Sequence, residues 1–301
     1  MRGVLIEAAI VHEMAAPAGR IRRMTTLYCG PYALTLDRPR IMGIVNLTSD
    51  SFSGDGVGGD ARAALAQAEA QRAAGADILD LGAESSRPGA APVPVEAEIR
   101  RLLPVLRAVR DWGVPVSVDT TKPEVMRMAI DEGAALINDI AALRAPGALE
   151  VVARSEVGVC LMHMQGEPRT MQDAPHYDDV VAEVQAFLVA RVLACVAAGI
   201  AQDRLLIDPG FGFGKTPEHN YALLRDLGRI AQIGVPVLAG LSRKSMLGAV
   251  TGQPNGAARM PSSVAAAVLA VERGARIVRV HDVAATKDAL AVWAAMERGN
   301  Q

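Results

Sequence analysis

Residues 114–139, VPVSVDTTKPEVMRMAIDEGAALIND, contain a complete strand–helix–strand unit and decide the fold class. The first five residues, VPVSV, form a short and mostly β-branched segment, as expected of a strand buried inside a parallel sheet. Pro123 then lies in the first turn of a helix expected over residues 122–132, where its missing N–H is tolerated. Gly133 follows at the position where a left-handed residue ends a helix, and ALIND begins the next strand.

The same unit recurs along the chain. Strands are expected at residues 41–45, 77–81, 114–118, 135–138, 159–163, 205–207, 235–239 and 276–280. Helices are expected at residues 60–74, 95–111, 122–132, 147–155, 177–199, 218–230, 262–273 and 286–298. Eight such units predict an α/β fold, a (β/α)8 TIM barrel that forms one domain over residues 25–301. A doubly wound sheet is the alternative, which the lack of a dinucleotide fingerprint disfavours.

Two short segments precede the barrel. Residues 25–40 are expected to form a small hairpin with a turn at Cys29-Gly30-Pro31. Residues 1–24 have interrupted apolar runs that make a poor secretory signal. We expect this segment to be a flexible extension.

The composition excludes several classes of protein. Half of the 301 residues are hydrophobic and 21% are charged, so the chain can bury a large core. The formal net charge of −2 argues against a nucleic-acid binder that relies on a basic face. No run of 18 uncharged apolar residues predicts a membrane span. Three scattered cysteines exclude a disulfide scaffold and a zinc cluster, and they favour a cytoplasmic location.

Lysine is rare in this chain, with four lysines against 27 arginines. Three of the four, Lys122, Lys215 and Lys244, follow expected strand ends. Because arginine is the default cation here, a lysine at such a position indicates a chemical requirement.

Polar residues lie at or just after the C-terminal end of nearly every expected strand. They are Asn46, residues 84–87, Asp119, residues 138–139, His163, Asp208, residues 242–244, Arg279 and His281. In a TIM barrel the C-terminal strand ends form the catalytic mouth. A single such residue is often only a helix cap, but eight strands that each deliver one predict a site.

The residue types indicate two kinds of ligand group. Asp119, Asn138 and Asp208 offer acceptors that suit the N–H edge of a flat heterocycle. Arg87, Arg279 and His281 offer cationic donors that suit phosphate, and Asn46 offers an oxygen ligand that suits Mg²⁺. The mouth therefore fits an aromatic heterocycle joined to a phosphate or diphosphate.

Several motifs resemble those of the dihydropteroate synthase family. They are residues 42–53 (MGIVNLTSDSFS), 84–90 (ESSRPGA), 117–120 (SVDT), 137–140 (INDI), 161–164 (LMHM), 208–215 (DPGFGFGK), 242–245 (SRKS) and 279–282 (RVHD). The resemblance extends from about residue 25 to about residue 298. It implies a (β/α)8 barrel that condenses (7,8-dihydropterin-6-yl)methyl diphosphate with 4-aminobenzoate in folate biosynthesis. It also implies Mg²⁺, sulfonamides as inhibitors and a homodimer.

The resemblance assigns roles to residues by motif. The pterin would be held by Asp119, Asn138, Asp208 and Lys244, with Met162 on its face. The diphosphate would be held by Asn46, Arg87, Arg279 and His281, with Asn46 also reaching Mg²⁺. The aminobenzoate pocket would be bordered by Phe52, Ser86, Pro88, Phe213 and Ser245. Asp119 and Lys244 are the expected catalytic residues.

Three other readings remain open from the sequence. One is a pterin-binding barrel that transfers methyl groups from folate, which would not need Arg87, Arg279 or His281. Another is a non-catalytic pterin-binding paralogue. The third is an aldolase that uses Lys244 as a Schiff-base lysine. Separately, the apolar helices over residues 264–271 and 289–295 are candidates for a dimer interface.

Overall fold

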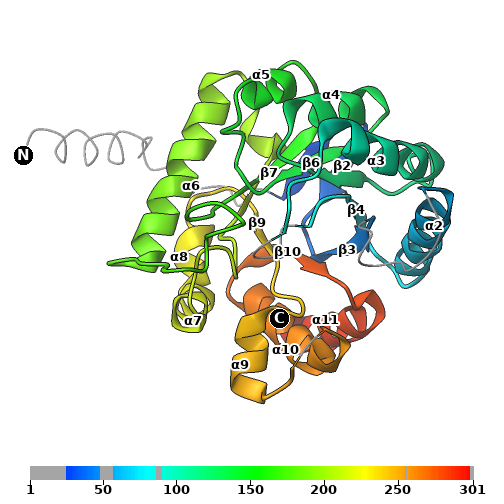
Figure 1. Cartoon of the computed structure of the whole chain (residues 1–301). Coiled ribbons are helices and arrows are strands. Elements are labelled where there is room, and N and C mark those ends of the chain that lie inside the picture. Colours follow the sequence, from blue (N-terminus) through cyan, green and yellow to red (C-terminus); the bar gives the residue numbers. More distant parts are fainter. Residues whose placement is uncertain (1–24, 48–56, 86–89, 255, 299–301) are drawn as a thin grey trace, which may run out of the picture.

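The computed structural model describes residues 25–47, 57–85, 90–254 and 256–298. Eight parallel strands close into a barrel in the order β10-β3-β4-β5-β6-β7-β8-β9, and helices surround it (Figure 1). The strands are β3 (Arg40–Asn46), β4 (Ile78–Gly82), β5 (Val116–Asp119), β6 (Leu136–Asp139), β7 (Gly158–Met162), β8 (Leu205–Asp208), β9 (Val237–Ala239) and β10 (Ala275–Val280). The expected (β/α)8 barrel is confirmed.

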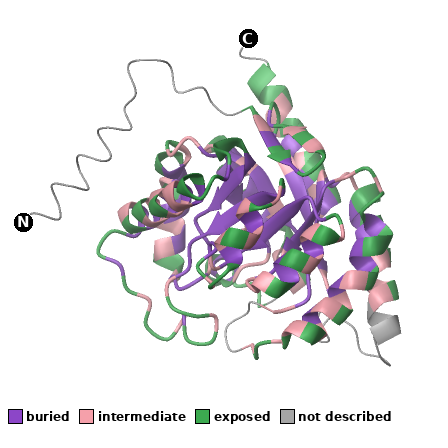
Figure 2. Ribbon diagram, turned by 90° about the horizontal axis from the view of Figure 1, so that it is seen from above, coloured by how far each residue is buried: buried purple, intermediate pink, exposed green. Residues whose placement is uncertain are grey.

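The helices follow the strands in turn. They are α2 (Val57–Ala73), α3 (Val95–Val109), α4 (Pro123–Asp131), α5 (Ala148–Ala153), α6 (Val180–Ala197), α7 (Pro217–Arg225), α8 (Leu227–Ala231), α9 (Ser245–Thr251), α10 (Met260–Glu272) and α11 (Val283–Arg298). Two 3₁₀ turns, Gln202–Arg204 and Gly256–Arg259, complete the set within the described residues. Burial is concentrated on the strands and on the helix faces turned toward them (Figure 2).

Alternate residues of each strand face two different cores. Leu79, Leu81 and their equivalents on the other strands pack with the helices in the main hydrophobic cluster. Met42, Ile78 and their equivalents form a second cluster inside the barrel. Side chains alternate with a period of two along a strand, so residues in step with Ile78 point into the barrel. This alternation determines which polar residues reach the mouth.

The expected hairpin is confirmed as β1 (Thr26–Cys29) and β2 (Tyr32–Thr35). Leu27 and Leu36 are buried, and both pack in the cluster inside the barrel. Gly30 occupies the turn with a φ of 54°, a conformation that glycine adopts without steric cost. The hairpin therefore closes the N-terminal end of the barrel, opposite the mouth.

Two helical features differ from the sequence expectations. The single helix expected at residues 218–230 is two helices, because Asp226 leaves the helical conformation and ends α7 before α8 begins. Helix α9 was not expected, since it has seven residues and Gly248 lies in its middle. A Cβ at Gly248 would lie 2.6 Å from the backbone carbonyl oxygen of Gln253 and from the Arg259 guanidinium, so close packing favours glycine there.

Helix α6 is long and apolar enough to satisfy the length and composition of a membrane-crossing helix. Its buried residues, Val184 and Leu188 among them, belong to the main core cluster on the barrel. Glu183 and Arg191 also lie within it. The helix is accounted for as an outer helix of the barrel.

Candidate active site

The barrel interior changes from apolar to charged along its axis. On β4, Ile78 belongs to the apolar cluster and Asp80, two residues on, is fully buried on the same face. Asn138 on β6 and Asp208 on β8 follow Leu136 and Leu206 of that cluster in the same way. The alternation of the strands therefore delivers these polar side chains to one mouth, as the sequence predicted for Asn138 and Asp208.

Arg279 lies between two carboxylates in this mouth. Its Nε donates to Oδ2 of Asp80 at 2.6 Å, and its Nη2 donates to Oδ2 of Asp119 at 2.9 Å. Burial alone would lower the pKa of Arg279, but the charges of Asp80 and Asp119 raise it. Sequence reasoning placed Arg279 with the anion and Asp119 with the heterocycle, and the structure brings the two into contact.

Sequence reasoning missed Asp80. The available signal was an aspartate inside the otherwise apolar strand segment ILDLG of β4, where a buried charge needs a partner. Its Oδ2 also lies 3.4 Å from Nδ2 of Asn138, whereas its Oδ1 is buried without a hydrogen-bond partner among the described residues. Asp80 is thus a fixed negative charge beneath the mouth.

Burial changes the proton affinity of three further groups here. It raises the pKa of Asp119 to about 7, with Arg279 opposing the shift and Asp80 adding to it. It lowers the pKa of Lys244 to about 8 and raises the pKa of Asp208. Asp208 is held by the N–H of Gly210, which donates to its Oδ1 at 2.7 Å. Asp119 and Lys244 therefore give the site one acid and one base that titrate near neutral pH.

Lys244 packs on an aromatic ring. Its Nζ lies 4.1 Å from the centre of the Phe213 ring, a cation–π contact. Phe213 in turn packs with Met162, Met164 and other residues in a small apolar cluster separate from the two cores. The expected pterin residues Lys244 and Met162 and the expected aminobenzoate residue Phe213 are therefore neighbours. Ser245 is exposed at the start of α9.

His281 differs from its expected state. The N–H of His281 donates to Ser242 Oγ at 3.2 Å, and Oγ lies 2.9 Å from His281 Nδ1. In a neutral ring, Nδ1 either accepts from the Ser242 hydroxyl, with the ring proton on Nε2, or carries the proton and donates to Oγ. Burial and the nearby positive charges of Arg243 and Arg279 lower the pKa of His281 to about 4. Burial and these positive neighbours therefore disfavour the cationic form of His281 in the ligand-free site.

The turn that carries Lys244 is held under strain. Arg243 has a φ of 59°, which is uncommon for a side chain larger than glycine. Its guanidinium donates to both carboxylate oxygens of Asp282, at 3.1 and 2.6 Å, and its N–H donates to Ser263 Oγ at 2.9 Å. These contacts fix Ser242 and Lys244 on either side of it, beside the end of β10.

The other lysines singled out by the sequence are also buried or half-buried. Lys122 contacts Glu84 and donates to Oε2 of the fully buried Glu98 at 2.6 Å. Lys215 lies among carbonyl oxygens beside His163. All three lysines at strand ends thus make specific polar or cation–π contacts, in accord with the sequence argument.

Some expected site residues lie outside the described residues, namely Phe52, Ser86, Arg87 and Pro88. Asn46, the expected Mg²⁺ ligand, ends β3 and is half-buried. In the described part of the chain, no group of three or more His, Cys, Asp or Glu side chains is placed to hold a metal ion. A divalent cation at Asn46 would therefore need its other oxygen ligands from a substrate and water.

Comparisons with known proteins match this site. Residues 42–281 match the family model described as pterin binding enzyme. The chain belongs to the pterin binding enzyme family. Within the family it is 54% identical over 271 residues to the dihydropteroate synthase of Neisseria meningitidis serogroup C. The aligned region covers 89% of this chain and 96% of that relative. The family resemblance seen in the motifs is therefore confirmed.

Solved structures of family members have the same fold. The Xanthomonas albilineans dihydropteroate synthase with 4-aminobenzoic acid is 55% identical, with a TM-score of 0.86 over 91% of this chain and 98% of that one. The same enzyme in complex with 7,8-dihydropteroate gives 51% identity and a TM-score of 0.81 over the same shares. The Yersinia pestis enzyme with a sulfonamide drug complex gives 45% identity and 0.86, over 91% and 99%. The chain is thus a pterin-binding enzyme of the dihydropteroate synthase type.

Proposed function

We propose that this chain condenses (7,8-dihydropterin-6-yl)methyl diphosphate with 4-aminobenzoate, to give 7,8-dihydropteroate and diphosphate. The observation that carries the proposal is the convergence of Asp119, Asn138, Asp208 and Lys244 beside Arg279 in the barrel mouth. A pterin presents adjacent N–H donors and ring acceptors along one edge. Carboxylate, amide and ammonium groups complement such an edge.

Arg279 can bind the diphosphate while it keeps its hydrogen bonds to Asp80 and Asp119. Its Nε and Nη2 each donate to one aspartate, and its Nη1 has no hydrogen-bond partner among the described residues. A guanidinium has five N–H donors, so it can hold an anion and both aspartates together. When the Ser242 hydroxyl donates to Nδ1, the Nε2–H of His281 is a second donor, neutral rather than charged.

Mg²⁺ fits the proposed site as a cation shared with the substrate. Asn46 would supply a protein oxygen, and few protein ligands suit Mg²⁺, which commonly keeps waters and substrate phosphates. When bound there, it would neutralise charge on the departing diphosphate.

The protein residues can promote the reaction by charge placement and orientation. Loss of diphosphate would leave a methylene cation conjugated with the pterin ring, and the Asp119 carboxylate would stabilise positive charge on that ring. The aniline nitrogen of aminobenzoate needs no strong base. It needs a fixed position against the cationic carbon, which Phe213 on its tightly held loop would help to provide. Asp119 and Lys244 are the proposed catalytic residues.

A turnover assay tests the proposal directly. The purified chain is incubated with the pterin diphosphate and 4-aminobenzoate, with and without Mg²⁺. Dihydropteroate and diphosphate are both quantified, and the reaction should form them in equal amounts. We expect product only when Mg²⁺ is present. A folded chain that binds the pterin but gives no product with Mg²⁺ would instead support a non-catalytic paralogue.

We further propose three properties that go with this activity. Sulfonamides should compete with aminobenzoate, because each presents an aniline ring to the same subsite. The protein should act as a homodimer, supported by the exposed apolar side chains on α10 and α11. A cytoplasmic location is supported by three free cysteines, all buried.

A further inference from the structure

Lys215 is a buried cation with no role in the proposed reaction. Only 3% of it is exposed. Its Nζ lies 3.0 Å from the carbonyl oxygens of Gly210 and Phe213 and from Nδ1 of His163. The His163 carbonyl oxygen is 3.4 Å away. An ammonium group has three N–H donors, so the three shorter contacts use all of them.

The groups around Nζ are arranged to receive these donors. Burial and the charge of Lys215 lower the pKa of His163 to about 3, so its ring is neutral and Nδ1 accepts. Burial also lowers the pKa of Lys215 itself to about 7, with Asp208 opposing the shift and Lys244 adding to it. Among the described residues, no carboxylate forms an ion pair with Lys215. Its contacts therefore serve to hold backbone and ring groups.

Lys215 lies where two loops touch backbone to backbone. Gly210 and Gly214 have φ values of 69° and 60°. A Cβ at Gly210 would lie 1.9 Å from the carbonyl oxygen of His163, and one at Gly214 would lie 2.4 Å from that of Gln165. The loop after β8 is thus pressed on the segment after β7, and Lys215 bonds to both.

We propose that Lys215 is a positioning residue. It holds the loop after β8, and through that loop it orients Asp208, at the end of β8, toward the pterin and Phe213 toward the aminobenzoate. Gly210, whose carbonyl accepts from Lys215, donates its own N–H to Asp208 at 2.7 Å. Phe213 accepts from Lys215 through its carbonyl and carries the ring on which Lys244 packs. The inference rests on the proposed role of Asp208 in binding the pterin.

A double-mutant cycle tests this connection. Lys215→Met, Asp208→Asn and the double variant are compared for the affinity of the pterin diphosphate with Mg²⁺, measured by calorimetry. Lys215→Met alone should weaken binding at least about tenfold and raise the KM for aminobenzoate. In the Asp208→Asn background the same change should cost less than about twofold, because residues acting through one network are not additive. Equal losses in both backgrounds would overturn the inference.

Matched variants separate positioning from loss of stability. Lys122→Met removes another lysine that follows a strand end, one that does not contact the loop after β8. Its effect on pterin affinity should be the same with and without Asp208→Asn. If Lys215→Met does not fold, Lys215→Gln retains two N–H donors without the charge and should give a smaller but still non-additive loss. If Asp208→Asn alone leaves pterin affinity unchanged, the proposed role of Asp208 is wrong. If Asp208→Asn weakens binding but the cycle is additive, only the role of Lys215 is wrong.

Discussion

Asp80 shows how one buried charge can set the chemistry of its neighbours. It adds to the raised pKa of Asp119, which burial brings to about 7, and it also holds Arg279. Because a bell-shaped kcat/KM profile reports groups of the free enzyme, we expect an acid limb near pH 7 from Asp119. An alkaline limb near pH 8 is expected from Lys244.

Asp80→Asn should move the acid limb to lower pH. The substitution removes a negative charge that raises the pKa of Asp119. It also makes Asp119 the one carboxylate among the described residues that still pairs with Arg279. Asp119 therefore ionises more easily. The measurement is kcat/KM for the pterin diphosphate between about pH 5.5 and about pH 9, which covers both expected limbs of the profile. Asp77→Asn is the control, since Asp77 pairs with Arg38 and Arg40 instead. An acid limb that stays in place in Asp80→Asn would contradict the coupling.

Arg279 and His281 should differ when each is replaced by alanine. Arg279 contacts Asp119 as well as being available to the diphosphate, so Arg279→Ala should weaken both the pterin diphosphate and a pterin without phosphate. Charged hydrogen bonds contribute about 1.5–3 kcal/mol, or roughly tenfold or more in affinity. His281 is a neutral donor, so His281→Ala should weaken only the diphosphate, by a few-fold. Calorimetry with both ligands distinguishes the two. An unchanged affinity of Arg279→Ala for the phosphate-free pterin would place Arg279 on the anion side alone.

Among the elements, the β1–β2 hairpin contributes to stability rather than to chemistry. Leu27→Ala should lower the free energy of unfolding by about 2–5 kcal/mol, because it opens a cavity in the apolar cluster inside the barrel. The KM values should not change, since the mouth is at the opposite end. Urea denaturation and steady-state kinetics provide the two measurements. Tyr28→Ala is the control in the same strand, because Tyr28 is 49% exposed and its loss should cost little. A changed KM in Leu27→Ala would show that the two ends of the barrel are coupled.

The barrel was predictable because its elements are specified locally. Each strand is an apolar run bounded by glycine or proline, and the following polar residue marks the mouth. Helix α9 was not predictable, since it is short and Gly248, which packs against Arg259, lies in its middle. Nothing in the local sequence marks the break at Asp226 between α7 and α8.

The candidate site was predictable in its residue types but not in its pairings. Asp119, Asn138, Asp208, Lys244 and Arg279 were found from their places after the strands. Nothing local indicates that Arg279 bridges Asp80 and Asp119, because Arg279 is 199 and 160 positions away from them along the chain. The lowered pKa of His281 likewise follows from its burial and from the positive charges of Arg243 and Arg279, which only the fold brings together.

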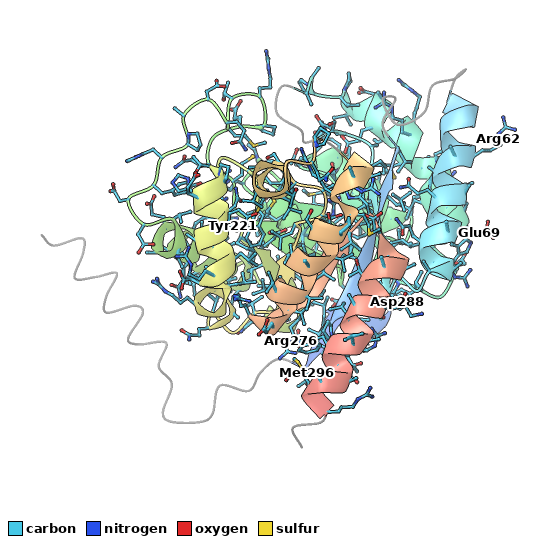
Figure 3. All side chains as sticks on the ribbon, turned by 90° about the horizontal axis from the view of Figure 1, so that it is seen from below. Arg62, Glu69, Tyr221, Arg276, Asp288 and Met296 are labelled. Atoms are coloured by element: carbon cyan, nitrogen blue, oxygen red, sulfur yellow. The ribbon has the colours of Figure 1, made fainter. Side chains whose placement is uncertain are left out.

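At the scale of the whole molecule, the fold separates the reaction from the surface that would join two subunits. The charged groups lie at the C-terminal ends of the strands, whereas exposed apolar side chains lie on the outer helices. Leu269 on α10 is 41% exposed, and Val292 and Met296 on α11 are 73% and 56% exposed. Helices α10 and α11 pack against each other, and Figure 3 shows Met296 near the end of α11. Neighbouring exposed apolar groups of this kind are typical of an interface.

A charge placed on this surface should separate the subunits. Val292→Glu would bury a carboxylate against apolar groups of a second copy, and in a symmetric dimer it would do so twice. We expect the unchanged chain to sediment as a dimer and Val292→Glu as a monomer, with the thermal midpoint of the isolated barrel little altered because Val292 is exposed. Val196→Glu is the matched control, since Val196 is 45% exposed on α6, at a different side of the barrel (Figure 1). A Val292→Glu protein that still sediments as a dimer would exclude this part of α11 from the interface. If Val196→Glu is instead the monomeric variant, the interface lies on α6, whose apolar outer surface would then be explained by a second subunit.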